Sequence, residues 1–125
     1  MKEDLKEGLH GEIAIETTND MTPPHLAEKG NFVYSTPAMI AHMERASLEA
    51  ISAYLDENET SVGVKVNISH IASTKIGETV RVTSRVIKVE GRRITFSVEA
   101  YNEKGKIGDG THQRVIIKRK PLEKK

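Results

Sequence analysis

The 125-residue sequence contains no cysteine and no tryptophan, and aromatic side chains make up only 4% of it. The absence of cysteine excludes disulfide bonds, thiolate zinc sites and a cysteine nucleophile. No apolar run approaches the roughly 20 residues needed to cross a bilayer, so no membrane-spanning segment is expected. The formal net charge of +1 provides no long-range attraction to nucleic acid or to an anionic membrane. Met1 to Gly11 lacks the apolar centre of a signal peptide, so a cytoplasmic protein is expected.

Hydrophobic residues make up 37% of the chain and charged residues 30%, a balance typical of a folded globular domain. A chain of 125 residues buries enough surface for one core but not for two, so we predict a single domain over residues 1–125. Residues 119–125 are expected to form a basic, frayed tail. A nucleic-acid-binding arm is the alternative, but the tail contains Glu123 and no aromatic residue, which favours a solvated segment.

The hydrophobic pattern changes its period twice along the chain. Residues 11–17 alternate between apolar and polar and predict a first strand, and residues 18–35 have the composition of a long irregular connection. Thr36 is a suitable N-cap and Pro37 suits the first helical position, so a helix is predicted to run to about Leu55.

From Ser61 onward the period falls to two, which predicts four strands. Turn residues at 90–91 and 103–105 indicate hairpins between successive strands. The predicted fold is therefore α+β, with one long helix against one strongly twisted antiparallel sheet.

Glu44 occupies an unexpected place on the predicted helix. On a helical wheel, Ile40, Leu48 and Ile51 fall within about 40° of it, whereas His42 lies on the opposite, polar side. A buried carboxylate is costly unless it has a hydrogen-bonding or charged partner. The sequence therefore predicts a polar partner for Glu44 on the sheet.

His70 is the candidate partner. It has the same parity as Val62, Val66 and Ile68, so it ends the apolar face of the first strand after the helix. We hypothesise that Glu44 and His70 meet in one half-buried pocket. The alternative is a structural ion pair or hydrogen bond with no chemical role.

Two further residues have both a functional and a structural interpretation. Thr36 either only caps the helix or also flanks a site whose acid, Glu44, lies about two turns and roughly 12 Å further along the helix axis. Arg114 shares parity with Ile116 and points either toward the core or a partner chain, or lies along the surface. The histidine spacings match no metal motif, so no metal site is expected.

Several blocks together resemble a known family. S-T-P-A-M-I-A-H-M-E at 35–44, V-G-V-K-V-N-I-S-H-I-A at 62–72, V-E-G-R-R-I-T-F-S-V-E-A at 89–100 and G-D-G-T-H-Q-R at 108–114 resemble, in order and spacing, the hotdog-fold thioesterases of the fluoroacetyl-CoA thioesterase-like branch. The resemblance extends from about residue 11 to residue 118. It implies a hotdog fold in which a sheet wraps around a central helix.

The resemblance also implies roles for individual residues. It assigns Thr36, Glu44 and His70 to a catalytic constellation, with Glu44 as general base or nucleophile, and it assigns Gly63 and Arg114 to binding of the acyl thioester. It further implies hydrolysis of a short or medium acyl-CoA, with no cofactor, by a homodimer or a tetramer built from such dimers. The substrate would lie between subunits, so residues of both chains would form the site.

Gly30 departs from the family, because a lid phenylalanine is expected there, and fluoroacetyl specificity is therefore not predicted. The alternatives to a thioesterase are a non-catalytic acyl-CoA-binding or sensing domain, and a purely structural dimeric module. A hydratase on the same fold is a third, although no matching catalytic block is present.

Overall fold

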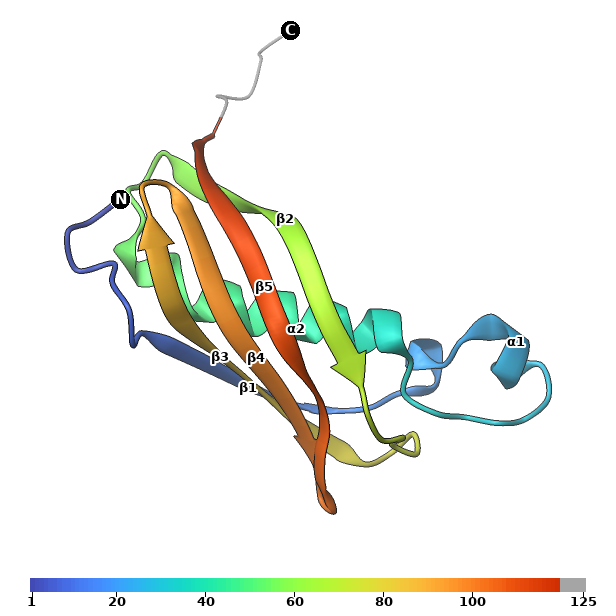
Figure 1. Cartoon of the computed structure of the whole chain (residues 1–125). Coiled ribbons are helices and arrows are strands. Elements are labelled where there is room, and N and C mark those ends of the chain that lie inside the picture. Colours follow the sequence, from blue (N-terminus) through green and yellow to red (C-terminus); the bar gives the residue numbers. More distant parts are fainter. Residues whose placement is uncertain (120–125) are drawn as a thin grey trace, which may run out of the picture.

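The computed structural model describes residues 1–119, so all but the first residue of the predicted basic tail lies outside the described residues. The chain forms five strands, one long helix and three short helical turns (Figure 1). In chain order these are β1 (His10–Glu16), η1 (Asn19–Met21), α1 (Pro24–Ala27), α2 (Thr36–Ile51), η2 (Ser52–Tyr54), β2 (Glu59–His70), β3 (Thr79–Glu90), β4 (Arg93–Asn102) and β5 (Gly105–Lys118). The predicted helix thus ends as a regular α-helix at Ile51, and a 3₁₀ turn completes the segment to Tyr54.

The strands form one antiparallel sheet in the order β1-β3-β4-β5-β2, and α2 runs along one face of it (Figure 1). The α+β prediction is confirmed. α2 contacts β1 and β3 more extensively than β4 or β2, so the helix covers the β2 side of the sheet poorly. None of the helices within residues 1–119 is long and apolar enough to span a membrane.

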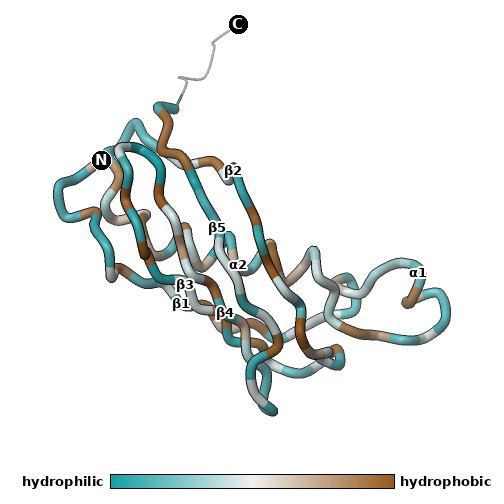
Figure 2. The backbone as a smooth tube through the Cα atoms, in the orientation of Figure 1, coloured by the Kyte–Doolittle hydropathy of each residue, from teal (hydrophilic) through white to brown (hydrophobic). Residues whose placement is uncertain are grey.

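The core lies between α2 and the inner face of the sheet. Hydrophobic and hydrophilic positions alternate along the strands (Figure 2), and Val82, Phe96 and Val98 are buried on the face toward the helix. Gly11 lets β1 approach α2 closely, since a Cβ there would lie 2.2 Å from the Ala46 carbonyl oxygen. The helix therefore meets the sheet partly through small side chains.

This close approach corrects the helical wheel. The buried residues of α2 are Met39, Met43, Ala46, Ser47, Ala50 and Ile51. Leu48 is exposed and Glu44 is half-buried, so both lie at the edge of the packed stripe and not at its centre. The helical-wheel prediction was wrong because it relied on the large apolar residues, whereas small side chains of α2 make the contact with β1.

A β-bulge in β2 changes which side chains share a face. Gly63 pairs with Arg114 and Lys65 pairs with Gln113, so Val64 is an extra residue without a partner. Before the bulge, Val62 pairs with Val115, away from the core. After it, His70 lies on the same face as Gly63. The prediction that Val62 and His70 share one apolar face was therefore wrong, because a bulge inverts the alternation.

Candidate active site

Thr36 and His70 are in direct contact. The Thr36 hydroxyl lies 2.7 Å from Nδ1 of His70, which joins the first residue of α2 to the last residue of β2. The N-cap of α2 is Ser35, whose Oγ accepts a hydrogen bond from the Ala38 N–H at 3.1 Å. The prediction that Thr36 caps the helix was wrong by one position. Since Ser35 caps the helix, the Thr36 hydroxyl is available to the histidine.

The surroundings of His70 favour a neutral ring. Burial lowers the pKa of His70, and the nearby backbone carbonyl of Ala72 offsets only part of this effect. In the neutral tautomer with its proton on Nε2, Nδ1 is the acceptor for the Thr36 O–H. Nε2 itself is buried and makes no hydrogen bond within residues 1–119. The pair can thus take up and return a proton at the threonine oxygen.

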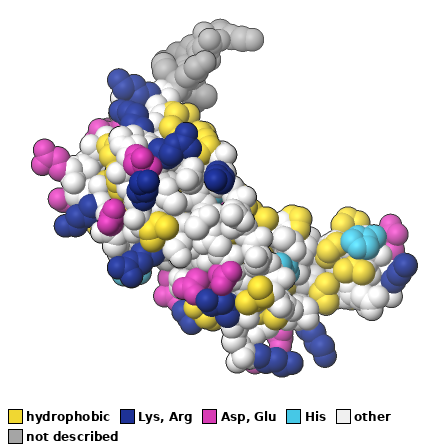
Figure 3. Space-filling view, in the orientation of Figure 1, with side chains coloured by type: hydrophobic (Ala, Val, Ile, Leu, Met, Phe, Trp, Pro, Cys, Tyr) yellow, Lys and Arg dark blue, Asp and Glu magenta, His cyan; other side chains and the backbone are white. Residues whose placement is uncertain are grey.

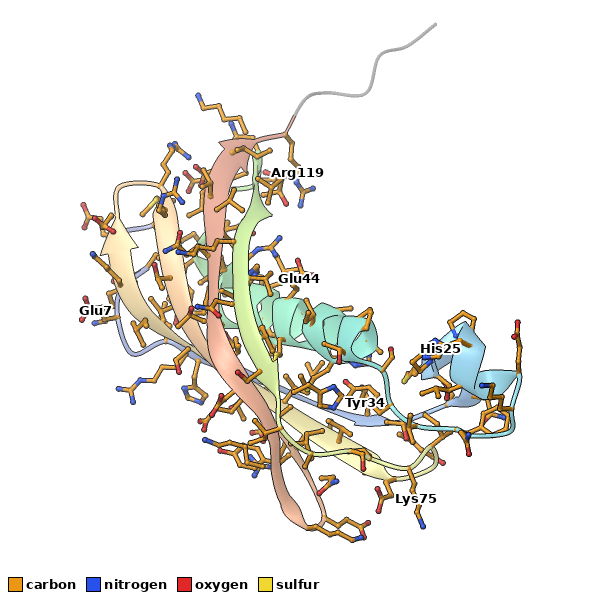
Figure 4. All side chains as sticks on the ribbon, turned by 45° about the vertical axis from the view of Figure 1, so that its right-hand side comes forward. Glu7, His25, Tyr34, Glu44, Lys75 and Arg119 are labelled. Carbon is orange, nitrogen blue, oxygen red and sulfur yellow. The ribbon has the colours of Figure 1, made fainter. Side chains whose placement is uncertain are left out.

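The pair opens onto a pocket of about 370 Å³, lined partly by the apolar residues Leu26 and Ile71. Tyr34 forms another wall, and it lies close to the start of α2 in Figure 4. Its ring meets His70 edge-on, with 6.5 Å between the ring centroids. The Thr36–His70 pair is therefore reached through a pocket whose walls are mostly apolar.

Glu44 contacts a second group of residues. Its Oε2 lies 3.5 Å from Nη1 of Arg114, and Figure 4 shows Glu44 on the side of α2 that faces β2. A Cβ at position 63 would lie 3.1 Å from Glu44 Oε2 and 3.4 Å from Arg114 Nη1. The missing side chain at Gly63 therefore leaves space for the carboxylate and the guanidinium to approach each other.

Within one chain, the structure keeps these two groups apart. Thr36 and Glu44 are separated by about 12 Å along α2, and no hydrogen bond or ion pair within residues 1–119 joins Glu44 to His70. The hypothesis of one intrachain Glu44–His70 pocket is not supported. The structure instead pairs Thr36 with His70 and Glu44 with Arg114.

Known proteins share this arrangement of sequence and fold. Residues 17–120 match the family model described as fluoroacetyl-CoA-specific thioesterase. The fluoroacetyl-CoA thioesterase of Streptantibioticus cattleyicolor is 38% identical, over 90% of this chain and 88% of that protein. The chain belongs to the fluoroacetyl-CoA-specific thioesterase family.

Solved structures agree with this placement in the fluoroacetyl-CoA-specific thioesterase family. A mutant of the fluoroacetyl-CoA-specific FlK in complex with acetyl-CoA superposes with a TM-score of 0.84 at 31% identity, over 91% of this chain and 90% of that one. A hot-dog-like protein from Thermanaerovibrio acidaminovorans superposes with a TM-score of 0.82 at 25% identity, over 90% and 83% of the two chains. The hotdog fold implied by the resemblance is confirmed.

This member of the thioesterase family also has a Tyr34–His42 pair that sequence reasoning missed. The Tyr34 hydroxyl lies 2.5 Å from His42 Nδ1, and the two rings are stacked. Burial, and secondarily the charge of Arg45, lowers the pKa of His42, while burial raises the pKa of Tyr34. The wheel placed His42 on the polar side of the helix, but the ring is half-buried. Because Tyr34 precedes the helix, no helical periodicity could have revealed this contact.

The structure decides between the two positions considered for Arg114, since its side chain is only 7% exposed and, like Ile116, is buried and not spread along the surface. Its assignment to substrate binding stays a prediction. His112, two residues earlier on the same face, was missed, although its parity with Arg114 was a usable signal. No group of three or more His, Asp or Glu side chains within residues 1–119 is placed to hold a metal ion.

Proposed function

We propose that this chain hydrolyses short or medium acyl-CoA thioesters to the free acid and CoA. The observation that carries the proposal is the 2.7 Å contact between Thr36 and His70 at the mouth of the apolar pocket. Membership of the family makes the chain a thioester hydrolase. The thioester bond is the reacting group, and the pocket receives the acyl chain.

We assign the chemical step to Glu44, His70 and Thr36. Glu44 takes a proton from water, whose oxygen bonds to the thioester carbonyl carbon while the carbon–sulfur bond breaks. The proton taken up by Glu44 passes by way of His70 to the departing thiolate, the second proton of the water stays with the acid product, and the Thr36 hydroxyl holds the imidazole or the carbonyl oxygen. Direct attack of the Glu44 carboxylate on the carbonyl is the alternative route, with water then hydrolysing the resulting anhydride.

A homodimer would complete this site. β2 is an edge strand whose Val62, Val64 and Val66 are 41–47% exposed, and an exposed apolar edge favours pairing with another strand. Hydrophobic side chains are also visible along this edge of the sheet in Figure 3. By contrast, the opposite edge, β1, has exposed acidic residues at Glu12 and Glu16. The β2 edge is therefore the proposed contact between two copies.

Antiparallel pairing of β2 with β2 of a second copy explains why the Thr36–His70 pair and the Glu44–Arg114 pair lie apart within one chain. Pairing centred on residues 62–69, most of which are exposed, places Gly63 opposite Ile68 of the partner subunit. That position is two residues from His70 of the partner subunit. Glu44, which lies beside Gly63, would then approach the Thr36–His70 pair of the other chain.

Gly30 is relevant to which acyl groups the protein accepts. It has a φ of 76° in the connection before α2, where the family pattern calls for a lid phenylalanine. Gly30 supplies no aromatic ring at this lid position. We therefore propose unsubstituted short or medium acyl chains as substrates.

The test is thiol release from acetyl-, butyryl-, hexanoyl- and fluoroacetyl-CoA, together with calorimetric binding of the same compounds. Turnover that is no faster with fluoroacetyl-CoA than with an unsubstituted chain supports the proposal. Binding without thiol release would establish an acyl-CoA-binding or sensing domain instead. Absence of both would leave a structural module and overturn the proposal.

A further inference from the structure

His112 is a buried histidine for which the proposed reaction has no role. It lies on β5, is only 1% exposed and stacks on Phe96 with 6.0 Å between the ring centroids. Nδ1 is 2.8 Å from the backbone oxygen of Lys65, which can only accept a hydrogen bond, so Nδ1 carries the proton. Nε2 is 3.2 Å from Nη1 of Arg114, which can only donate, so Nε2 accepts. The contacts thus define one neutral tautomer.

Arg114 directs its hydrogen bonds to neutral groups. Its Nε donates to Ser61 Oγ at 2.8 Å and its Nη2 donates to the Ser61 carbonyl at 3.0 Å, while Nη1 donates to His112. Glu44 Oε2 stands 3.5 Å from Nη1, close enough for attraction between the charges. No hydrogen bond joins Glu44 to Arg114 within the described chain. The carboxylate oxygens therefore remain available to water or substrate.

We propose that His112 is a positioning residue for the thioesterase reaction, which keeps Arg114 from closing onto Glu44. By accepting from Nη1, its Nε2 keeps the guanidinium from turning into a bidentate pair with the carboxylate. A bidentate pair would occupy both oxygens that the general base needs. This inference rests on the proposed role of Glu44, and it adds a residue that the Thr36, Glu44 and His70 constellation does not contain.

The neighbours of His112 keep it neutral. Arg114 faces it from its own strand, Glu44 from α2, the Lys65 backbone from β2 and the Phe96 ring from β4. Burial, and secondarily Arg114, lowers the pKa of His112, although the Lys65 carbonyl and Glu44 oppose this. Protonation would remove the acceptor at Nε2 and release Nη1 of Arg114.

Two substitutions of His112 test its hydrogen bonds to Lys65 and to Arg114 separately. His112→Asn keeps a donor near the position of Nδ1 for the Lys65 carbonyl but loses the acceptor for Arg114. His112→Gln reaches further and retains an acceptor for Arg114 but loses the donor to Lys65. If His112 positions Arg114, His112→Asn lowers kcat by about tenfold with KM nearly unchanged, and His112→Gln retains most of the activity. If His112 only supports the bulge at Lys65, the order of the two variants reverses, and the proposal is overturned.

Two further measurements keep the test decisive. In a Glu44→Gln background, His112→Asn should cause no additional loss, because its effect passes through Glu44. A Glu44→Gln variant with normal activity would instead refute the proposed role of Glu44. If both His112 variants unfold, ¹⁵N NMR of the native protein decides: a protonated Nδ1 with an accepting Nε2 supports the proposal, and a protonated Nε2 refutes it.

Discussion

The Thr36 hydroxyl and Nδ1 of His70 lie 2.7 Å apart although 34 positions separate the two residues in the sequence. The contact exists because α2 begins where β2 ends, and because Ser35 caps the helix in place of Thr36. The cap and the proposed catalytic hydroxyl are thus neighbouring residues with separate roles.

Substitutions at these neighbouring positions should have different effects. Ser35→Ala removes the cap, so it should lower the free energy of unfolding by ~1 kcal/mol and leave kcat nearly unchanged. Thr36→Val removes the hydroxyl that His70 contacts, so kcat should fall by about tenfold or more, while Thr36→Ser retains activity. Denaturant unfolding and steady-state kinetics on the same preparations check both. Normal turnover in Thr36→Val would exclude a catalytic role for the hydroxyl.

Glu44→Gln should lower kcat on the order of 10²-fold because it removes the proposed base or nucleophile. Folding should persist, since the partner left behind, Arg114, keeps its hydrogen bonds to Ser61 and His112. Glu49→Gln is the matched control, as Glu49 is exposed on the same helix and should tolerate the change. Thermal midpoints and thiol release are compared. A folded Glu44→Gln protein with near-normal turnover would refute the assignment.

Activity should depend on the neutral form of His70. Burial lowers the pKa of His70 below its ordinary value of 6.5, so the accepting Nδ1 persists to a pH below 6.5. The rate kcat/KM should therefore be level near neutral pH and should fall only in more acidic solution, as protonation removes the acceptor for Thr36. An NMR titration of His70 beside the pH–rate profile tests this. A midpoint of His70 above 6.5 would contradict it.

Glu59 should govern part of the acid sensitivity of the fold. Its side chain is 2% exposed, and hydrogen bonds from the Met1 amine, the Asp56 N–H and Arg92 lower its pKa from 4.5 to about 2. A lowered carboxyl pKa stabilises the protein above about pH 4.5, and this stability is lost as the pH falls toward 2.

Between pH 5 and 2, the free energy of unfolding should therefore depend less on pH in Glu59→Gln than in the native protein. Glu57→Gln, at an exposed position two residues earlier, is the control. Equal slopes for the native protein and Glu59→Gln would show that Glu59 does not contribute.

The native protein should scatter light as a particle of twice the 13.9 kDa chain mass at micromolar concentration. Val62→Lys places a charge on the exposed β2 edge, on the face away from the core, so it should yield monomers and lower activity. Ile117→Lys is the matched control, because Ile117 is similarly exposed but lies on β5, away from the edge. A monomeric native protein with full activity would refute the composite site.

The order of the long helix and the strands, the α+β class and the family could be predicted from the sequence, whereas the short helical turns at Asn19–Met21 and Pro24–Ala27 could not. Local periodicity distinguishes the helix from the strands, and ordered blocks with fixed spacing identify relatives. The sequence also identified Glu44 as an unusual carboxylate, but it left open whether Arg114 points inward or lies along the surface. These features depend on residues close together in the chain or on the alternation along one strand.

Which side chains are in contact depends on the tertiary structure. The bulge at Val64 reverses which residues of β2 face the core. Because Gly11 lets β1 pack closely on the small residues of α2, Glu44 lies at the edge of the packed face and not at its centre. The contacts of His70 with Thr36 and of His112 with Lys65 join residues 34 and 47 positions apart. Periodicity describes one element at a time, whereas such contacts depend on how two elements dock, which is set by side-chain size and strand register.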